Sequence, residues 1–175
     1  MTWLTKKKQQ GSLQDENAFV DFAESIGARA FCTAYRWIRN RQGAEDLVQD
    51  ALLKAWRSRA KVGDNPKAWF YKILWNAFLD QTKQNSLVSL IDDEEDIPAP
   101  WSYSNIETRM DIERLLNNLS DTDRNLVALR YAEDFTIEEI SKITGMRMGT
   151  VKSRIHRALK YLREKSYDGS HEKTL

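Results

Sequence analysis

Residues 136–163 constrain the fold most, because their pattern is typical of two helices joined by a tight turn. Apolar side chains recur at helical spacing on both sides of Gly145. A turn this short needs a residue that tolerates positive φ, which glycine does without a Cβ penalty. The segment therefore predicts a helix-turn-helix. Its apolar stripes are Ile137, Ile140 and Ile143 in the first helix, and Val151, Ile155, Leu159 and Leu162 in the second.

The second of these helices is strongly basic. Residues 142–165 hold eight basic residues against Glu164 alone, a formal charge of +7. A solvated cationic face on an ordinary helical hairpin is the plain alternative, but the glycine and the paired apolar stripes together favour a helix that binds duplex DNA. Such binding should weaken steeply with salt. The candidate DNA-contacting residues, on or beside the face opposite the apolar stripe, are Arg147, Thr150, Lys152, Ser153, His156, Arg157 and Lys160.

Charge elsewhere in the chain is segregated. The 175 residues carry a net charge of only +1, with 41% apolar residues, enough for folded cores. Residues 92–111 hold seven acidic residues against Arg109, a formal charge of −6. The near-neutral total therefore conceals an acidic stretch beside a basic module.

Metal, disulfide and membrane signals are absent from the sequence. Cys32 is the only cysteine, so no intramolecular disulfide can form, and its apolar neighbours predict a buried side chain. The only histidines, His156 and His171, do not have the spacing of a zinc site, so we expect neither metal nor cofactor. No apolar run reaches membrane-spanning length, and we expect a cytoplasmic protein with no direct membrane insertion.

Helical periodicity predicts an all-α fold of two small domains joined by an acidic flexible linker. We expect a helical bundle at residues 15–86, with helices at 16–27, 28–39, 44–58 and 66–84, the last capped by Asn65. Acids, prolines and serines interrupt every period at residues 87–105, the predicted linker. The second domain is predicted at residues 106–166, with Ser120 or Asp121 as a cap. Residues 1–14 are expected to be disordered, and 167–175 to form a frayed tail.

The helix predicted at 44–58 carries an apolar residue where solvent is expected. Its apolar side chains cluster on one face, whereas Leu53 lies opposite, among Asp46, Gln49 and Asp50. An apolar residue ringed by polar ones suggests a docking surface for a partner. An ordinary solvated helix with one stray leucine explains the pattern equally well.

The helix predicted at 66–84 (PKAWFYKILWNAFLDQTKQ) carries aromatic side chains that project in most directions around its axis. Aromatic residues left outside the core could stack unpaired bases, with nearby lysines and asparagine contacting the strand. A fully buried central helix of the bundle is the alternative that the spacing favours. The candidates for single-stranded DNA contact are Trp69, Tyr71, Lys72, Asn76 and Lys83.

These segments together resemble the bacterial RNA polymerase sigma factors of the sigma-70 family, specifically the extracytoplasmic-function class. The resemblance spans residues 18–163 in the family's order. AEDLVQDALLKAW resembles the polymerase-docking helix, residues 66–84 resemble the promoter-melting helix, and residues 119–163 resemble the reader of the upstream promoter element. Departures include Asp50 where glutamate is usual, and Ser141 where alanine is usual.

The resemblance implies a role for each surface. Asp46, Gln49, Asp50 and Leu53 would bind core RNA polymerase, and Asn76 would hold a flipped base of the melted −10 element. Lys152, Ser153, His156 and Arg157 would read the −35 element as duplex, with Arg157 and Lys152 reaching guanine edges. The linker acids would pass through basic polymerase channels. The implied partners are core RNA polymerase, promoter DNA and an anti-sigma factor, with no small-molecule substrate and no catalytic residue.

Two other classes of protein fit part of the pattern. A stand-alone helix-turn-helix regulator would bind duplex DNA as a dimer without polymerase, but it leaves residues 44–84 unexplained. An enzyme that binds a divalent metal through residues 92–96 would need a supporting histidine or phosphate loop, which is missing. We therefore expect a sigma factor and no enzymatic activity.

Overall fold

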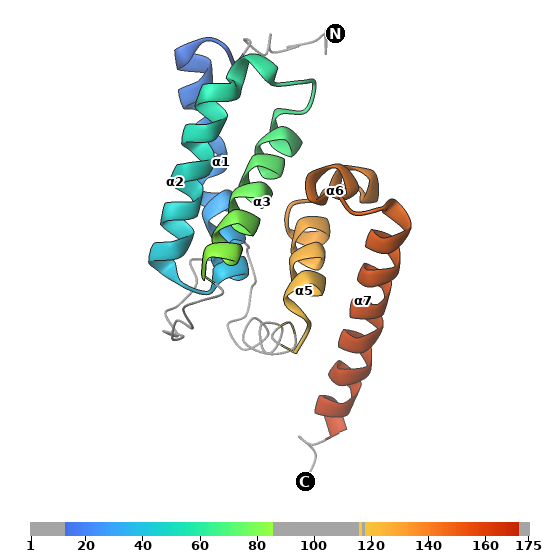
Figure 1. Ribbon diagram of the computed structural model, residues 1–175. Coiled ribbons are helices and arrows are strands. Elements are labelled where there is room, and N and C mark those ends of the chain that lie inside the picture. Colours follow the sequence, from blue (N-terminus) through green and yellow to red (C-terminus); the bar gives the residue numbers. More distant parts are fainter. Residues whose placement is uncertain (1–12, 86–115, 117, 172–175) are drawn as a thin grey trace, which may run out of the picture.

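The computed structural model describes residues 13–85, 116 and 118–171, and every regular element in those ranges is helical (Figure 1). Residues 1–12 of the predicted N-terminal segment, most of the second unit's first helix and the acidic linker lie outside the described residues. The elements are α1 (Glu16–Ile38), α2 (Arg41–Ser58), η1 (Arg59–Lys61), α3 (Pro66–Asn85), α5 (Asp121–Val127), η2 (Ala128–Ala132), α6 (Ile137–Thr144) and α7 (Met148–His171).

Side-chain caps begin the first unit's helices. Asp15 accepts a hydrogen bond from the backbone N–H of Ala18, and Asn40 accepts one from that of Gly43. Asn65, the predicted cap of α3, accepts one from the N–H of Ala68 at 2.9 Å. Each oxygen satisfies a donor that the first helical turn leaves without an intrahelical partner.

The predicted break between residues 27 and 28 is wrong, because α1 runs unbroken from Glu16 to Ile38. Glycine inside a helix costs about 1 kcal/mol relative to alanine. Packing of α1 on both sides of Gly27 offsets this cost, since Phe19 and Ile26 precede it in the core and Ala30 and Ala34 follow it. The helix ends at Arg39, which adopts the left-handed conformation with φ 57°.

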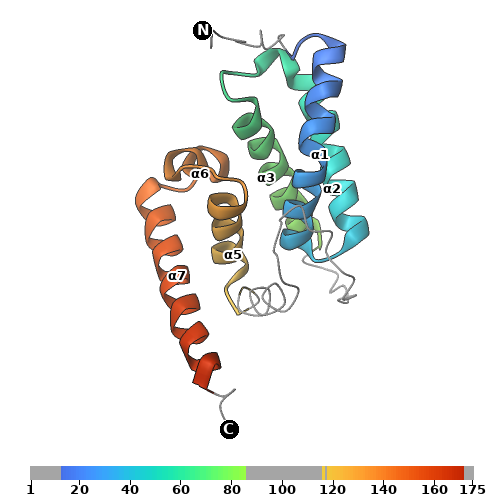
Figure 2. The same cartoon turned by 180° about the vertical axis from the view of Figure 1, so that it is seen from behind.

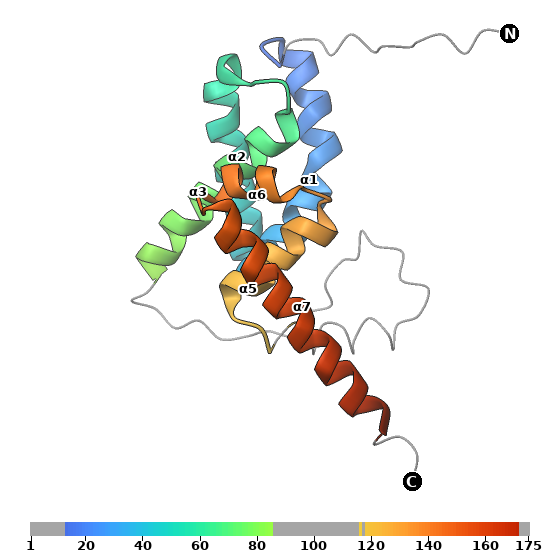
Figure 3. The ribbon, with the colours of Figure 1, turned by 90° about the vertical axis from the view of Figure 1, so that its right-hand side faces the viewer.

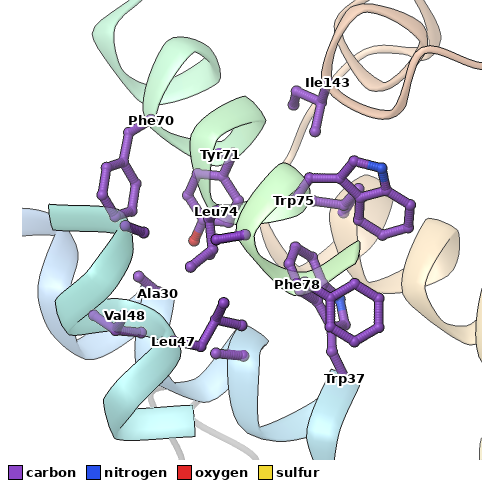
Figure 4. Packing of buried hydrophobic residues seen from close by; sticks show 14 of the residues in the cluster. Ala30, Trp37, Leu47, Val48, Phe70, Tyr71, Leu74, Trp75, Phe78 and Ile143 are labelled. Carbon is purple, nitrogen blue, oxygen red and sulfur yellow. The ribbon is translucent and has the colours of Figure 1, made fainter. Parts of the chain in front are cut away.

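Aromatic residues are buried on more than one side of α3, but the helix is not fully buried. Phe70, Tyr71, Trp75 and Phe78 lie in the core, whereas Lys72, Asn76 and Lys83 are exposed, so the alternative of a fully buried central helix holds only for part of the circumference. Figure 4 shows Phe70 and Leu74 among the residues of α1 and α2, while Trp75 lies towards Ile143 of α6. The second unit therefore covers a side of α3 that α1 and α2 leave open.

The second unit contains the predicted helix-turn-helix. Ser120 caps α5 by accepting from the N–H of Asp123, and Thr136 forms a reciprocal capping box with Glu139 at the start of α6. Gly145 ends α6 with φ 74°, as the turn requires. The last helix continues to His171, beyond the predicted end of the domain at residue 166.

The two units pack against each other and share one hydrophobic core. Figures 1 and 2 show α3 beside α6, and Figure 3 shows α7 extending away from the first unit. Phe135, Ile140, Ile143 and Val151 of the second unit belong to the same cluster as the residues of α1 to α3. The predicted all-α, two-unit fold is confirmed, and its units are in contact.

Cys32 is buried with 4% of its surface exposed, as predicted. No group of candidate metal ligands occurs in the described ranges. Among the helices of those same ranges, none combines the length and the apolar character that a membrane span requires.

Candidate protein and nucleic-acid interfaces

The outward face of α2 brings together the predicted docking residues. Asp46, Gln49, Asp50 and Leu53 are all exposed, whereas Leu47, Val48 and Ala51 on the other face are buried. Leu53 is 56% exposed, more than any other large apolar side chain of the described residues. The helix therefore presents an accessible leucine beside acidic side chains.

Hydrogen bonds and ion pairs hold the acidic groups along this face. Gln42 donates to an Asp46 carboxylate oxygen at 2.9 Å, and Lys54 Nζ lies 2.8 Å from Asp50 Oδ2. Such exposed pairs contribute little stability, but they restrict the side chains to the helix surface. Asp46, Asp50 and Lys54 also line a shallow groove between α2 and α3, whose far side holds Asp80 and Lys83.

The candidate residues for single-stranded DNA divide between the two sides of α3. At about 100° per residue, Trp69, Lys72, Asn76 and Lys83 project within about 60° of one another, and Tyr71 projects from the opposite side. Lys72, Asn76 and Lys83 are exposed and Trp69 is half-buried. These side chains form one open strip, which we call the outer strip of α3.

Tyr71 does not belong to this strip. Its side chain is fully buried, with its ring centroid 5.1 Å from that of Phe135 in an edge-on contact. A base could not stack on it in this arrangement. Burial raises the pKa of Tyr71 above its ordinary value of 10.0, and the negative charge of nearby Glu133 raises it further.

The raised pKa predicts an alkaline loss of stability. Below pH 10 the phenol is neutral in both the folded and the unfolded state; above it the unfolded state releases the proton and the folded state retains it. The free energy of unfolding should therefore fall above about pH 10, by at most about 1.4 kcal/mol per pH unit from this group. Denaturant unfolding between about pH 8 and pH 11 would measure it, with Tyr71→Phe as the comparison. Parallel curves for the two proteins would contradict the prediction.

The predicted duplex-reading residues lie on the free side of α7 and at its start. Val151, Ile155 and Ala158 pack inward, which orients the intervening polar side chains towards solvent. The cationic face is therefore accessible and continuous along the helix. Exposed on it or just before it are Arg147, Thr150, Lys152, Ser153, His156, Arg157 and Lys160.

The sequence did not point to Arg130, Tyr131 or Glu133 as functional candidates. Arg130 and Tyr131 lie on η2 and line a shallow groove with Lys152 and His156 of α7. Glu133 follows η2 and is buried. The five-residue π-helical turn of η2 rotates these side chains out of the register that α-helical periodicity predicts, so no sequence pattern marked them.

Comparisons with known proteins match family models to both helical units of the chain. The family model for sigma-70 region 2 matches residues 23–87, and the model for sigma-70 region 4 matches residues 109–162. RNA polymerase sigma factor SigV of Bacillus subtilis is 34% identical over 133 residues, which span 74% of this chain and 80% of SigV. The chain belongs to the sigma-70 family. This sigma factor is of the extracytoplasmic-function class, as is SigW of Bacillus subtilis, which is 25% identical over 94% of the chain and 97% of SigW.

Solved structures support the same assignment for this sigma factor. The sigma factor RpoE of Bartonella quintana, in complex with the anti-sigma factor NepR, is 34% identical with a TM-score of 0.65. The match covers 82% of this chain and 95% of that one. CnrH, in complex with the cytosolic domain of CnrY, shares the fold with a TM-score of 0.64 at 19% identity.

Proposed function

We propose that this sigma factor uses its three outward surfaces for separate steps of promoter recognition. The outer face of α2 binds core RNA polymerase, the outer strip of α3 holds the melted −10 element, and the free face of α7 reads the −35 element as duplex. The observation that supports this division is that each surface is exposed while the opposite face of its helix is buried.

The α2 face has the composition of a protein-binding surface. An apolar anchor such as Leu53, surrounded by polar groups, is the arrangement in which a few side chains supply most of the binding energy. Asp46 and Asp50 add negative charge to this face, so a basic partner surface is the complementary one. Gln49 contributes donors and an acceptor beside them.

The outer strip of α3 suits single-stranded DNA. Asn76 can donate to and accept from the edge of an unpaired base, Trp69 offers a partly open ring, and Lys72 and Lys83 flank them with positive charge. Stacking contributes about 1–3 kcal/mol per base in single-strand binders, comparable to the few kcal/mol needed to flip out a base. We leave Tyr71 out of this strip because it is buried against Phe135.

The free face of α7 suits the major groove, which admits an α-helix. Arg157 can bond a guanine edge through both arms of its guanidinium, and Lys152 can bond one as a point charge. Ser153 already donates to the Thr150 carbonyl at 3.1 Å, so its hydroxyl oxygen remains able to accept. Arg147 and Lys160, nearer the ends of this face, suit phosphate contacts that position the helix.

No chemical step is assigned to the chain, since polymerase supplies the catalysis. Its partners in this proposal are core RNA polymerase, promoter DNA and an anti-sigma factor, the last because the similar sigma factor RpoE of Bartonella quintana is in complex with the anti-sigma factor NepR in a solved structure. Because polymerase and promoter DNA are in the cytoplasm, we expect this sigma factor to act there.

Run-off transcription with purified core polymerase and genomic DNA fragments tests the function. New transcript start sites should appear only when the sigma factor is added. Tight binding to a palindromic duplex without polymerase, together with no new start sites, would instead identify a stand-alone regulator.

A further inference from the structure

Glu133 is a buried carboxylate at the contact between the two units. Its side chain is 2% exposed. Thr33 on α1 donates a hydrogen bond to Glu133 Oε1 at 2.9 Å, while Arg29 Nε and Lys67 Nζ lie 3.4 Å and 3.2 Å from Oε2. A buried carboxylate is tolerated only when it is paired, and all of these partners belong to the first unit.

The same cations also bind the backbone around Glu133. Lys67 Nζ donates to the Glu133 carbonyl at 2.6 Å, and Arg29 Nη2 donates to the Ala132 carbonyl at 2.9 Å. Both carbonyls lie at the end of η2, where carbonyl groups lack intrahelical partners. Arg29, Thr33 and Lys67 therefore form a socket that receives the end of this helical turn, side chain and backbone together.

Neighbouring contacts extend the socket. Phe135 packs edge-on against Tyr71, and Lys67 Nζ lies 4.8 Å from the centroid of the Phe135 ring. Asn65 donates to Glu139 Oε1 at 2.7 Å on the exposed side of the contact. The contact thus combines a charged centre, an aromatic pair and a polar edge.

Closed packing of the units is incompatible with reading both promoter elements at once. The −35 and −10 positions are about 25 base pairs apart, which is about 85 Å at about 3.4 Å per pair. Helices in contact have axes only about 10 Å apart, and α7 spans about 36 Å at 1.5 Å per residue. Because α3 packs directly on α6, the units must separate before α3 and α7 can contact their elements together.

We propose that Glu133 in the socket of Arg29, Thr33 and Lys67 is a latch that keeps the free sigma factor closed. The docking face of α2, the outer strip of α3 and the reading face of α7 stay exposed in the closed state, so the latch controls their separation and not their access to solvent. The fraction of open molecules then sets the apparent affinity with which the sigma factor and polymerase together bind the promoter. This inference rests on the proposed function.

The charges of the latch favour reversible closure. Arg29 and Lys67 keep 47% and 35% of their side-chain surface exposed, so water already solvates part of each cation. On opening, the carboxylate and both cations become fully hydrated, which offsets much of the lost attraction. The contact can therefore hold the units together and still release them.

Two substitutions on opposite sides of the contact test the latch. Glu133→Gln keeps the shape and the Thr33 hydrogen bond but removes the charge, and Lys67→Met removes a cation from the socket. Each should raise the ratio of open to closed molecules about tenfold or more. Glu138→Gln is the matched control, because it makes the same change in an exposed pair with Lys142 on α6.

Closure can be measured without polymerase. The parent for this test carries Cys32→Ala, Asn65→Cys and Glu139→Cys. A reducible thiol crosslinker about 10 Å long would join its two cysteines across the contact. Crosslinking should be efficient in this parent and in the Glu138→Gln control, and slower in the Glu133→Gln and Lys67→Met variants. Equal crosslinking in all of them would overturn the latch.

Function is measured separately. The Glu133→Gln and Lys67→Met proteins should form initiation complexes with core polymerase on the promoter about tenfold faster, while their binding to core polymerase alone stays unchanged because the α2 face is exposed in the closed state. The crosslinked chain should lose run-off transcription until the bridge is reduced. Lower melting temperatures without faster complex formation on the promoter would show a merely structural contact, and full activity of the crosslinked chain would show that opening is unnecessary; either result overturns the proposal. If the uncrosslinked parent itself gives no transcripts, the proposed function fails, and the crosslinking result still reports on closure.

Discussion

Replacing Leu53 with lysine is expected to weaken binding to core RNA polymerase at least about a hundredfold. Loss of a central apolar anchor costs about 2 kcal/mol or more, which is about thirtyfold in affinity. A cation among Asp46 and Asp50 also opposes the basic partner surface that these acids favour. The fold should be unaffected, because Leu53 is exposed on α2 and lysine is a good helix former.

Fluorescence anisotropy of the labelled sigma factor, titrated with core polymerase, would measure this loss. Val20→Lys is the matched control, since Val20 is also an exposed apolar residue of the first unit and lies on α1. Both variants should melt at the temperature of the parent. Undiminished affinity of the Leu53→Lys protein would remove the α2 face as the docking surface.

Local signals in the sequence were sufficient for most of the helical framework. Asn65, Ser120 and Gly145 each act through their own backbone neighbourhood, as caps or as a left-handed turn, and the structure confirms all of these roles. Gly27 misled the prediction, because a glycine inside a helix weakens the local signal while tertiary packing maintains the helix.

Contacts between the two units could not be predicted from the sequence. Thr33 and Glu133 are separated by 100 positions, and nothing local to either residue indicates the other. The aromatic residues of α3 show how far such reasoning extends. Their distribution indicated that a single side could not bury them all, but only the structure shows that Phe135 covers Tyr71 and that the outer strip retains Asn76.

Substitution of Arg157 by alanine is expected to reduce discrimination at the −35 element by about 10-fold to 100-fold. A bidentate contact between arginine and guanine is worth about 1–3 kcal/mol, and alanine removes both hydrogen bonds. Holoenzyme formation through α2 should be unchanged. Arg157 is exposed on α7, so the helix-turn-helix should keep its stability.

The measurement compares transcription from a responsive promoter with transcription from the same promoter carrying substitutions in its −35 element. For the parent the two promoters differ strongly, and for Arg157→Ala they should become similar. Lys142→Ala is the control, because it removes an exposed cation from α6, outside the reading face. Its effect should be small and equal on both promoters, since phosphate contacts carry no sequence information. Equal losses on both promoters for Arg157→Ala would place this side chain on the phosphate backbone and not on a base edge.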